Sequence, residues 1–129
     1  MGIKNYSKNF ILKEFTVRIE RISMSGNDMK KVRITVMRMA RYDDLISEYE
    51  NPIEHACDMK LGKVFVAVGG ERPDGFCESA WQSVSPFVMT LACGGENFYD
   101  GWMKNPKSAM ISCNDGFRPV SFLLETMDK

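Results

Sequence analysis

The sequence predicts a single α+β domain with a mostly antiparallel sheet, in the order β-β-α-β-α-β-β, and one long kinked helix packed on the sheet. Several segments alternate apolar and polar residues with period two, which is typical of half-buried strands. One stretch, Cys77–Ala92, follows helical spacing over about four turns. The length of 129 residues suffices for one hydrophobic core of modest size.

A long antiparallel hairpin is expected over residues 10–39. Its first strand, Phe10–Ile22, places apolar residues on one parity and polar residues on the other. The stretch Ser23–Asp28 has turn chemistry, and alternation resumes at residue 32. The apolar positions of the two strands are Phe15, Val17, Ile19, Val32, Ile34 and Val36.

Two helices and a strand are expected in the middle of the chain. Tyr42–Tyr49 has helical spacing with aspartates in the first turn, and Asn51-Pro52 ends it. Val64–Val68 is apolar on both parities, which is typical of a strand covered on both faces. The long helix ends at a glycine pair, and Pro86 predicts a kink or a division near residues 83–85.

The chain closes with two further strands, Ala109–Cys113 and Phe117–Thr126. Between them, Asn114-Asp115-Gly116 fits a three-residue hairpin loop. In such a loop a type I turn is followed by a glycine in the left-handed region, which forms a bulge. The loop thus accounts for three polar or flexible residues without any chemistry.

Charge is distributed unevenly along the chain although the net charge is zero. Residues 1–41 carry ten Lys/Arg and three Asp/Glu, giving +7, and residues 42–129 carry seven and fourteen, giving −7. The basic residues alternate with apolar ones, as on the solvent face of a sheet, so nucleic acid is not an expected partner. We expect a homo-oligomer, a dimer or trimer, in which residues 1–28 form an added strand or an exchange arm on the α+β domain of residues 29–129.

The sequence also indicates where in the cell the protein is expected and which types of cysteine site it lacks. No apolar stretch approaches the roughly 20 residues of a membrane span, and the N-terminus lacks the apolar core of a secretory signal. We therefore expect a cytoplasmic protein without a membrane partner. The four cysteines are at least 16 residues apart, so the short spacing of zinc ribbons and redox dithiols is missing.

Two motifs resemble a known family. GFCESAW, residues 75–81, and CNDGFRPVSFLLE, residues 113–125, look like signatures of a family of short, uncharacterised bacterial and archaeal proteins. The resemblance covers about residues 29–128 and includes a strand similar to MKKVRITV. It implies three family cysteines, at Cys57, Cys77 and Cys113, but no established function. This chain departs from the pattern at Asp58, where the family usually has proline, and in its additional residues 1–28.

The cysteines leave two interpretations open. In the first, Cys57, Cys77 and Cys113 converge with His55 on a metal, zinc or an iron–sulfur centre, since thiolates with one imidazole suit these ions. Cys77 lies at the helix start, where we expect the helix dipole to stabilise a thiolate. In the second, the three are separate thiols, with Cys77 on the buried stripe of the helix, Cys113 packed under the hairpin and Cys57 incidental.

A small-molecule ligand is the alternative to a metal. The residues that would contact it are Cys77, Trp81, Cys113, Asp115 and Arg118. Arg118 has two interpretations, because it either binds an anionic ligand or, as favoured here, pairs with a carboxylate, Asp115 or a distant one.

The sequence therefore predicts a small protein with a cysteine-bearing pocket that binds a ligand or a metal. No catalytic residue is assigned. The alternative of another class is a non-catalytic accessory or interaction subunit whose motifs only stabilise the fold.

Overall fold

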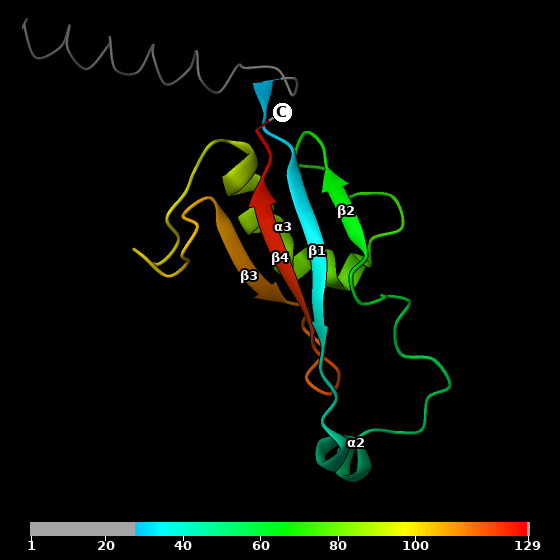
Figure 1. The fold of residues 1–129 in the computed structure, drawn as a ribbon. Helices are drawn as coiled ribbons and strands as arrows, with labels where there is room; N and C mark the ends of the chain where they lie inside the picture. The colour runs from blue at the N-terminus through cyan, green and yellow to red at the C-terminus, as the bar shows by residue number, and fades with distance from the viewer. Residues whose placement is uncertain (1–27, 129) are drawn as a thin grey trace, which may run out of the picture.

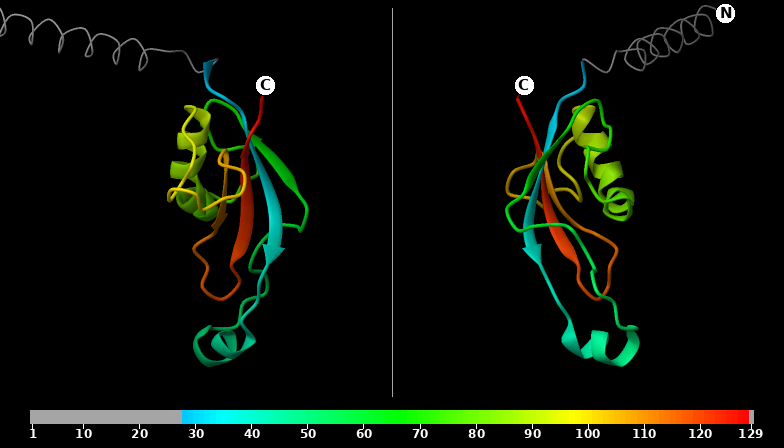
Figure 2. Two further views of the ribbon diagram at one scale, coloured as in Figure 1. Left: turned by 60° about the vertical axis from the view of Figure 1, so that its left-hand side comes forward. Right: turned by 90° about the vertical axis from the view of Figure 1, so that its right-hand side faces the viewer.

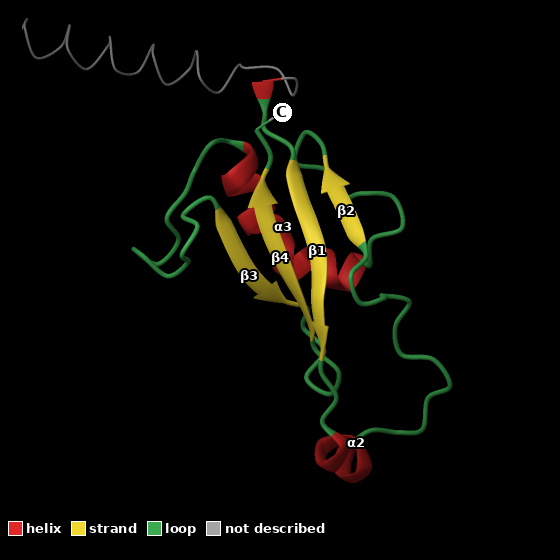
Figure 3. Cartoon of the chain, viewed as in Figure 1, coloured by secondary structure: helices red, strands yellow, loops and turns green. Residues whose placement is uncertain are grey.

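A computed structural model describes residues 28–128 (Figure 1). Within this range the chain forms four strands and two helices, which Figure 3 distinguishes by colour. In chain order they are β1 (Val32–Met39), α2 (Asp43–Tyr49), β2 (Val64–Ala67), α3 (Glu78–Ala92), β3 (Ser108–Ser112) and β4 (Val120–Thr126). The expected strand over residues 10–22 lies outside the described residues. Its expected hairpin pairing with β1 is wrong, because β2 and β4 already occupy the two edges of β1.

The strands form one antiparallel sheet in the order β2-β1-β4-β3. β1 and β4, the first and last strands described, are neighbours in its centre, while β2 and β3 form the edges. α3 connects the two edge strands and lies against one face of the sheet (Figure 2). The expected α+β domain with an antiparallel sheet and one long helix is confirmed in this form.

The core lies between α3 and the sheet, as the alternation of the strands predicts. On β1 the residues at every second position from Val32 to Val36 are buried, and Arg33 between them is exposed. α3 supplies the opposite layer through residues at helical spacing. The buried residues of these elements include Val32, Ile34, Val36, Val84, Val88, Leu91, Phe122 and Leu124.

β2 shows how the position of a strand in the sheet decides its burial. Phe65 and Ala67 point into the core, whereas Val64 and Val66 are 51% and 38% exposed. Within residues 28–128, then, only one face of this apolar strand is covered. The expected cover on the second face is not supplied by any helix or strand in that range (Figure 2).

α3 runs as one 15-residue helix through Pro86, so of the two outcomes predicted near residues 83–85, a kink or a division, the division is wrong. Proline removes one backbone donor, but the helical residues on both sides of it, Val84 and Val88, are fully buried and hold the helix on the sheet. The hydroxyl of Thr90 donates to the carbonyl of Pro86 at 2.9 Å.

No helix of the described residues is long and apolar enough to cross a membrane.

The loop between β3 and β4 is longer than the predicted three residues. It runs from Cys113 to Pro119, and Gly116 does not have positive φ, so the predicted glycine bulge is wrong. The Asp115 carboxylate instead closes the turn by accepting the backbone N–H groups of Phe117 and Arg118 at 2.8 and 3.1 Å. Pro119 has no N–H for the ladder, which delays the start of β4 to Val120.

Phe76 is the centre of the aromatic part of the core. Its side chain is 1% exposed, and its ring centroid lies 5.0 Å from that of Phe65 and 5.2 Å from that of Phe122. The Trp81 ring meets it edge-on at 6.0 Å. One residue between β2 and α3 thus joins the edge strand, the central strand and the helix.

We expect Phe76→Ala to lower the free energy of unfolding by about 3–5 kcal/mol, because it removes a buried ring from contacts that cannot close over the cavity. Denaturant unfolding followed by circular dichroism would measure this loss. Tyr49→Ala, at an aromatic ring that is 73% exposed, is the control and should cost about 0.5 kcal/mol or less. Equal losses for the two variants would contradict the central role of Phe76.

Candidate functional site

The start of α3 is positioned by a tight turn over residues 73–76. The N–H of Phe76 donates to the carbonyl of Pro73 at 3.1 Å, and Gly75 between them has φ of +78°. A positive φ at the third residue of a turn is the position for which glycine is suited. The Arg72 guanidinium donates to the Phe76 carbonyl at 2.6 Å. This turn and the burial of the Phe76 ring fix where the next residue, Cys77, is placed.

Cys77 occupies the N-cap of α3. Its backbone is extended, with φ of −57° and ψ of 125°, and its carbonyl accepts the first helical N–H, from Trp81. Its thiol makes no capping hydrogen bond to the first turn, and the residue is exposed. The predicted position at the helix start is confirmed.

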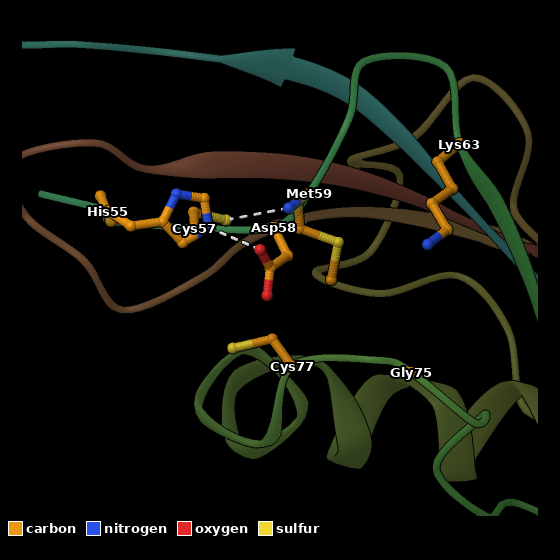
Figure 4. A pocket seen from close by; sticks show the side chains of 8 residues that line it. His55, Cys57, Asp58, Met59, Lys63, Gly75 and Cys77 are labelled. Atoms are coloured by element: carbon orange, nitrogen blue, oxygen red, sulfur yellow. Dashed lines mark hydrogen bonds and ion pairs between the residues drawn. The ribbon is translucent and has the colours of Figure 1, made fainter.

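A pocket of about 260 Å³ lies between the start of α3 and the loop before β2 (Figure 4). Cys77 and Gly75 form the α3 side. The opposite side comes from residues 55–59, and Lys63 adds a cation. Figure 4 shows the Cys77 side chain opposite the side chains of His55, Cys57 and Asp58. Cys57, Cys77 and His55 therefore line one cavity.

The loop side of the pocket is organised by short-range contacts. His55 Nε2 lies 2.5 Å from Asp58 Oδ1, and both side chains are well exposed. The N–H of Met59 donates to Cys57 Sγ at 3.3 Å, and Cys57 and Met59 pack against the core. Cys57 is therefore anchored, while the imidazole–carboxylate pair faces solvent at the rim.

Cys113 does not line this pocket, so the predicted convergence of three cysteines is not formed. Its Sγ accepts the N–H of Val120 at 3.2 Å, and its own N–H donates to the Val120 carbonyl. The thiol thus accepts a hydrogen bond at the base of the β3–β4 hairpin, and Cys113 packs against the core. In the part of the chain that the structure describes, no group of three or more His, Cys, Asp or Glu side chains could hold a metal ion. The expected zinc or iron–sulfur centre has no ligand set among these residues.

The β3–β4 loop connects both helices through its side chains. Asn114 accepts the Ser79 hydroxyl at 2.8 Å, which ties the loop to the first turn of α3. Arg118 Nη1 donates to both carboxylate oxygens of Glu50, at 2.7 and 2.8 Å, which ties it to the end of α2. The predicted pairing of Arg118 with a carboxylate is confirmed, and the partner is distant in sequence.

The other residues expected to contact a ligand have structural contacts as well. Asp115 closes its own loop through two backbone donors. Trp81, in the first turn of α3, is half-buried and packs edge-on against Phe76. Of the five residues proposed for ligand contact, Cys77 lines the pocket, while Cys113, Asp115 and Arg118 make the hydrogen bonds that shape the hairpin.

Three residues of this region were not predicted from the sequence. Asp58 was noted only as a departure from the family pattern, yet its spacing of three from His55 could have indicated the pair. Lys63 had no signal beyond its charge. Glu50 could not have been found, because it meets Arg118 across 68 residues of sequence.

Comparisons with protein-family models, with curated proteins and with solved structures find no match for this chain. The family resemblance carried by the two motifs therefore stays a prediction.

We expect Glu50→Ala to lower the free energy of unfolding by about 2 kcal/mol, since it leaves the largely buried Arg118 guanidinium without its partner. The matched control is Asp43→Ala, which breaks the exposed pair with Arg41 and should cost about 0.5 kcal/mol or less. Urea denaturation of the variants measures both losses. If Glu50→Ala were as mild as the control, the ion pair would not hold α2 to the hairpin.

Proposed function

We propose that this protein binds a small molecule in the pocket between residues 55–59 and the start of α3, with the Cys77 thiol as its main contact. The observation that carries the proposal is an exposed thiol at a helix N-cap that also lines a cavity. Lys63, His55 and Asp58 supply charged and hydrogen-bonding groups at the rim of the same cavity. A small polar or thiol-reactive molecule matches this lining and a volume of about 260 Å³.

The choice of cysteine at this position supports the proposal. An N-cap with Ser, Thr, Asp or Asn stabilises a helix by about 1 kcal/mol because its side-chain oxygen accepts a first-turn N–H. Cys77 makes no such bond, so its sulfur stays available to the pocket. The first-turn N–H groups, which have no acceptor within the helix, also lie at this end of α3 and can donate to a polar or anionic ligand.

A second candidate function is that of an interaction subunit without chemistry. It is favoured by the apolar side chains that β2 exposes on the outer face of the sheet, Val64 and Val66. Such exposed apolar surface is typical of contact sites between protein segments or chains. This candidate requires nothing of Cys77, and the reactivity of that thiol therefore separates the two functions.

Cys77 should react with iodoacetamide roughly tenfold faster than Cys93, as measured by mass spectrometry of the labelled peptides. Cys93 is a matched internal control, because it is also exposed but is the C-cap of the same helix and does not line the pocket. Cys77→Ser should remove the fast phase, and Cys93→Ser should leave it unchanged. Equal rates at the two thiols would refute the proposed role of Cys77 and favour the interaction subunit.

Cys77→Ser should also raise the free energy of unfolding, by about 0.5–1 kcal/mol, since serine can accept the first-turn N–H that cysteine leaves without a capping bond. Thermal and denaturant unfolding of the purified variant would measure the gain, and Cys93→Ser serves as control. A loss of stability in Cys77→Ser would mean that the thiol is needed by the fold rather than held for a ligand.

A further inference from the structure

One face of the sheet is not covered by any helix or strand of residues 28–128. α3 packs on the opposite face, and the views of Figure 2 show no helix on the outer one. The strand registers align a row of side chains across this face, in which Val64 pairs with Thr35, Thr35 with Leu123, and Leu123 with Met110. Val64 and Met110 at the two ends of the row are 51% and 37% exposed.

The neighbouring row has a different character. It contains Val66, which is 38% exposed, beside Arg33 and Glu125, whose charged groups lie 3.9 Å apart. The outer face therefore has three apolar residues and one threonine in one row, and one balanced ion pair in the next. A surface of this kind is suited to an amphipathic segment that buries apolar side chains and leaves its own charges in water.

The chain contains such a segment outside the described residues. Between Phe10 and Ile22, Phe15, Val17 and Ile19 fall on one parity, and Thr16, Arg18 and Glu20 fall on the other. In strand geometry the apolar set needs a surface to cover, and the polar set faces solvent. The apolar parity of this segment and the outer face of the sheet therefore have matching character.

The position at which this segment joins the domain permits the contact. The described chain begins at Asp28, four residues before β1, which is a central strand of the sheet. The intervening stretch Ser23–Asp28 has the composition of a turn. At about 3.3 Å per residue, the strand-like segment spans more than the width of a four-stranded sheet, which is roughly 14 Å between its outer strands.

We propose that residues 10–22 pack as a strand-like cover on the outer face of the sheet in the same molecule, with Phe15, Val17 and Ile19 on the row of Val64, Leu123 and Met110. This contact is independent of the Cys77 pocket, which lies on the side of α3. The contact would cover the exposed side chains of Val64 and Val66 on β2 with residues of the same chain.

The test uses the full-length protein and its methionine methyl groups in NMR, with a soluble gadolinium chelate as the probe of exposure. Met110 lies on the outer face, while Met89 on α3 is 44% exposed and Met59 is buried. We expect Met110 to lose about half or less of the signal that Met89 loses, as a methyl group covered by packed side chains should. Equal losses at Met110 and Met89 would show an open face and overturn the proposal.

Two matched variants identify the cover. Val17→Asp places a charge on the apolar parity and should raise the loss at Met110 to that of Met89, while Thr16→Asp on the polar parity should leave it low. Met59 reports whether each variant is folded, and the wild-type comparison stands even if one is not. Protection of Met110 that persists in Val17→Asp would assign the cover to another occupant, such as a second copy, and overturn the proposal.

Light scattering of the same samples shows whether the covering segment comes from the same molecule or from a second copy. Loss of protection in Val17→Asp at unchanged mass supports the contact within one molecule. Loss of protection together with a fall in mass would place the segment on a partner copy and overturn the arrangement within one molecule.

Discussion

The burial of the Phe76 ring is the constraint on which the rest of this structure depends. The ring touches Phe65 on the edge strand, Phe122 on a central strand and Trp81 on α3. Because Phe76 directly precedes the N-cap residue of α3, its anchoring sets where the helix begins. The same anchoring leaves the following side chain, Cys77, at the surface beside the pocket. Packing in the core thereby determines the geometry of the candidate site.

The β3–β4 loop is the second organising feature, and it works through hydrogen bonds rather than burial. Asn114 contacts the first turn of α3, Arg118 binds Glu50 at the end of α2, and Cys113 accepts a backbone donor at the base of the hairpin. Residues that resemble a reactive cluster in the sequence therefore make hydrogen bonds to the backbone of the hairpin and to the two helices. The chemistry that remains available lies at Cys77, with Cys57, His55 and Asp58 across the cavity.

Prediction from the sequence succeeded where a pattern depends on local periodicity. The strand beginning at Val32, the short helix before Glu50 and the long helix after Cys77 all follow from the spacing of their apolar residues. It failed where several local solutions compete. Asn114-Asp115-Gly116 fits a short glycine turn, but an aspartate that accepts two backbone donors and a following proline favour a longer loop. At Pro86, packing against the sheet outweighed one missing backbone donor.

The sequence by itself determined the α+β class, the placement of Cys77 at a helix start and the need of Arg118 for a carboxylate, since each depends on neighbouring residues or on the chemistry of one side chain. Only the tertiary structure decided that Cys57 and Cys77 share a pocket while Cys113 does not, and that Glu50 is the partner of Arg118. These are contacts between segments far apart in sequence. Strand order and register set such distances, and the spacing of residues along one chain contains no measure of either.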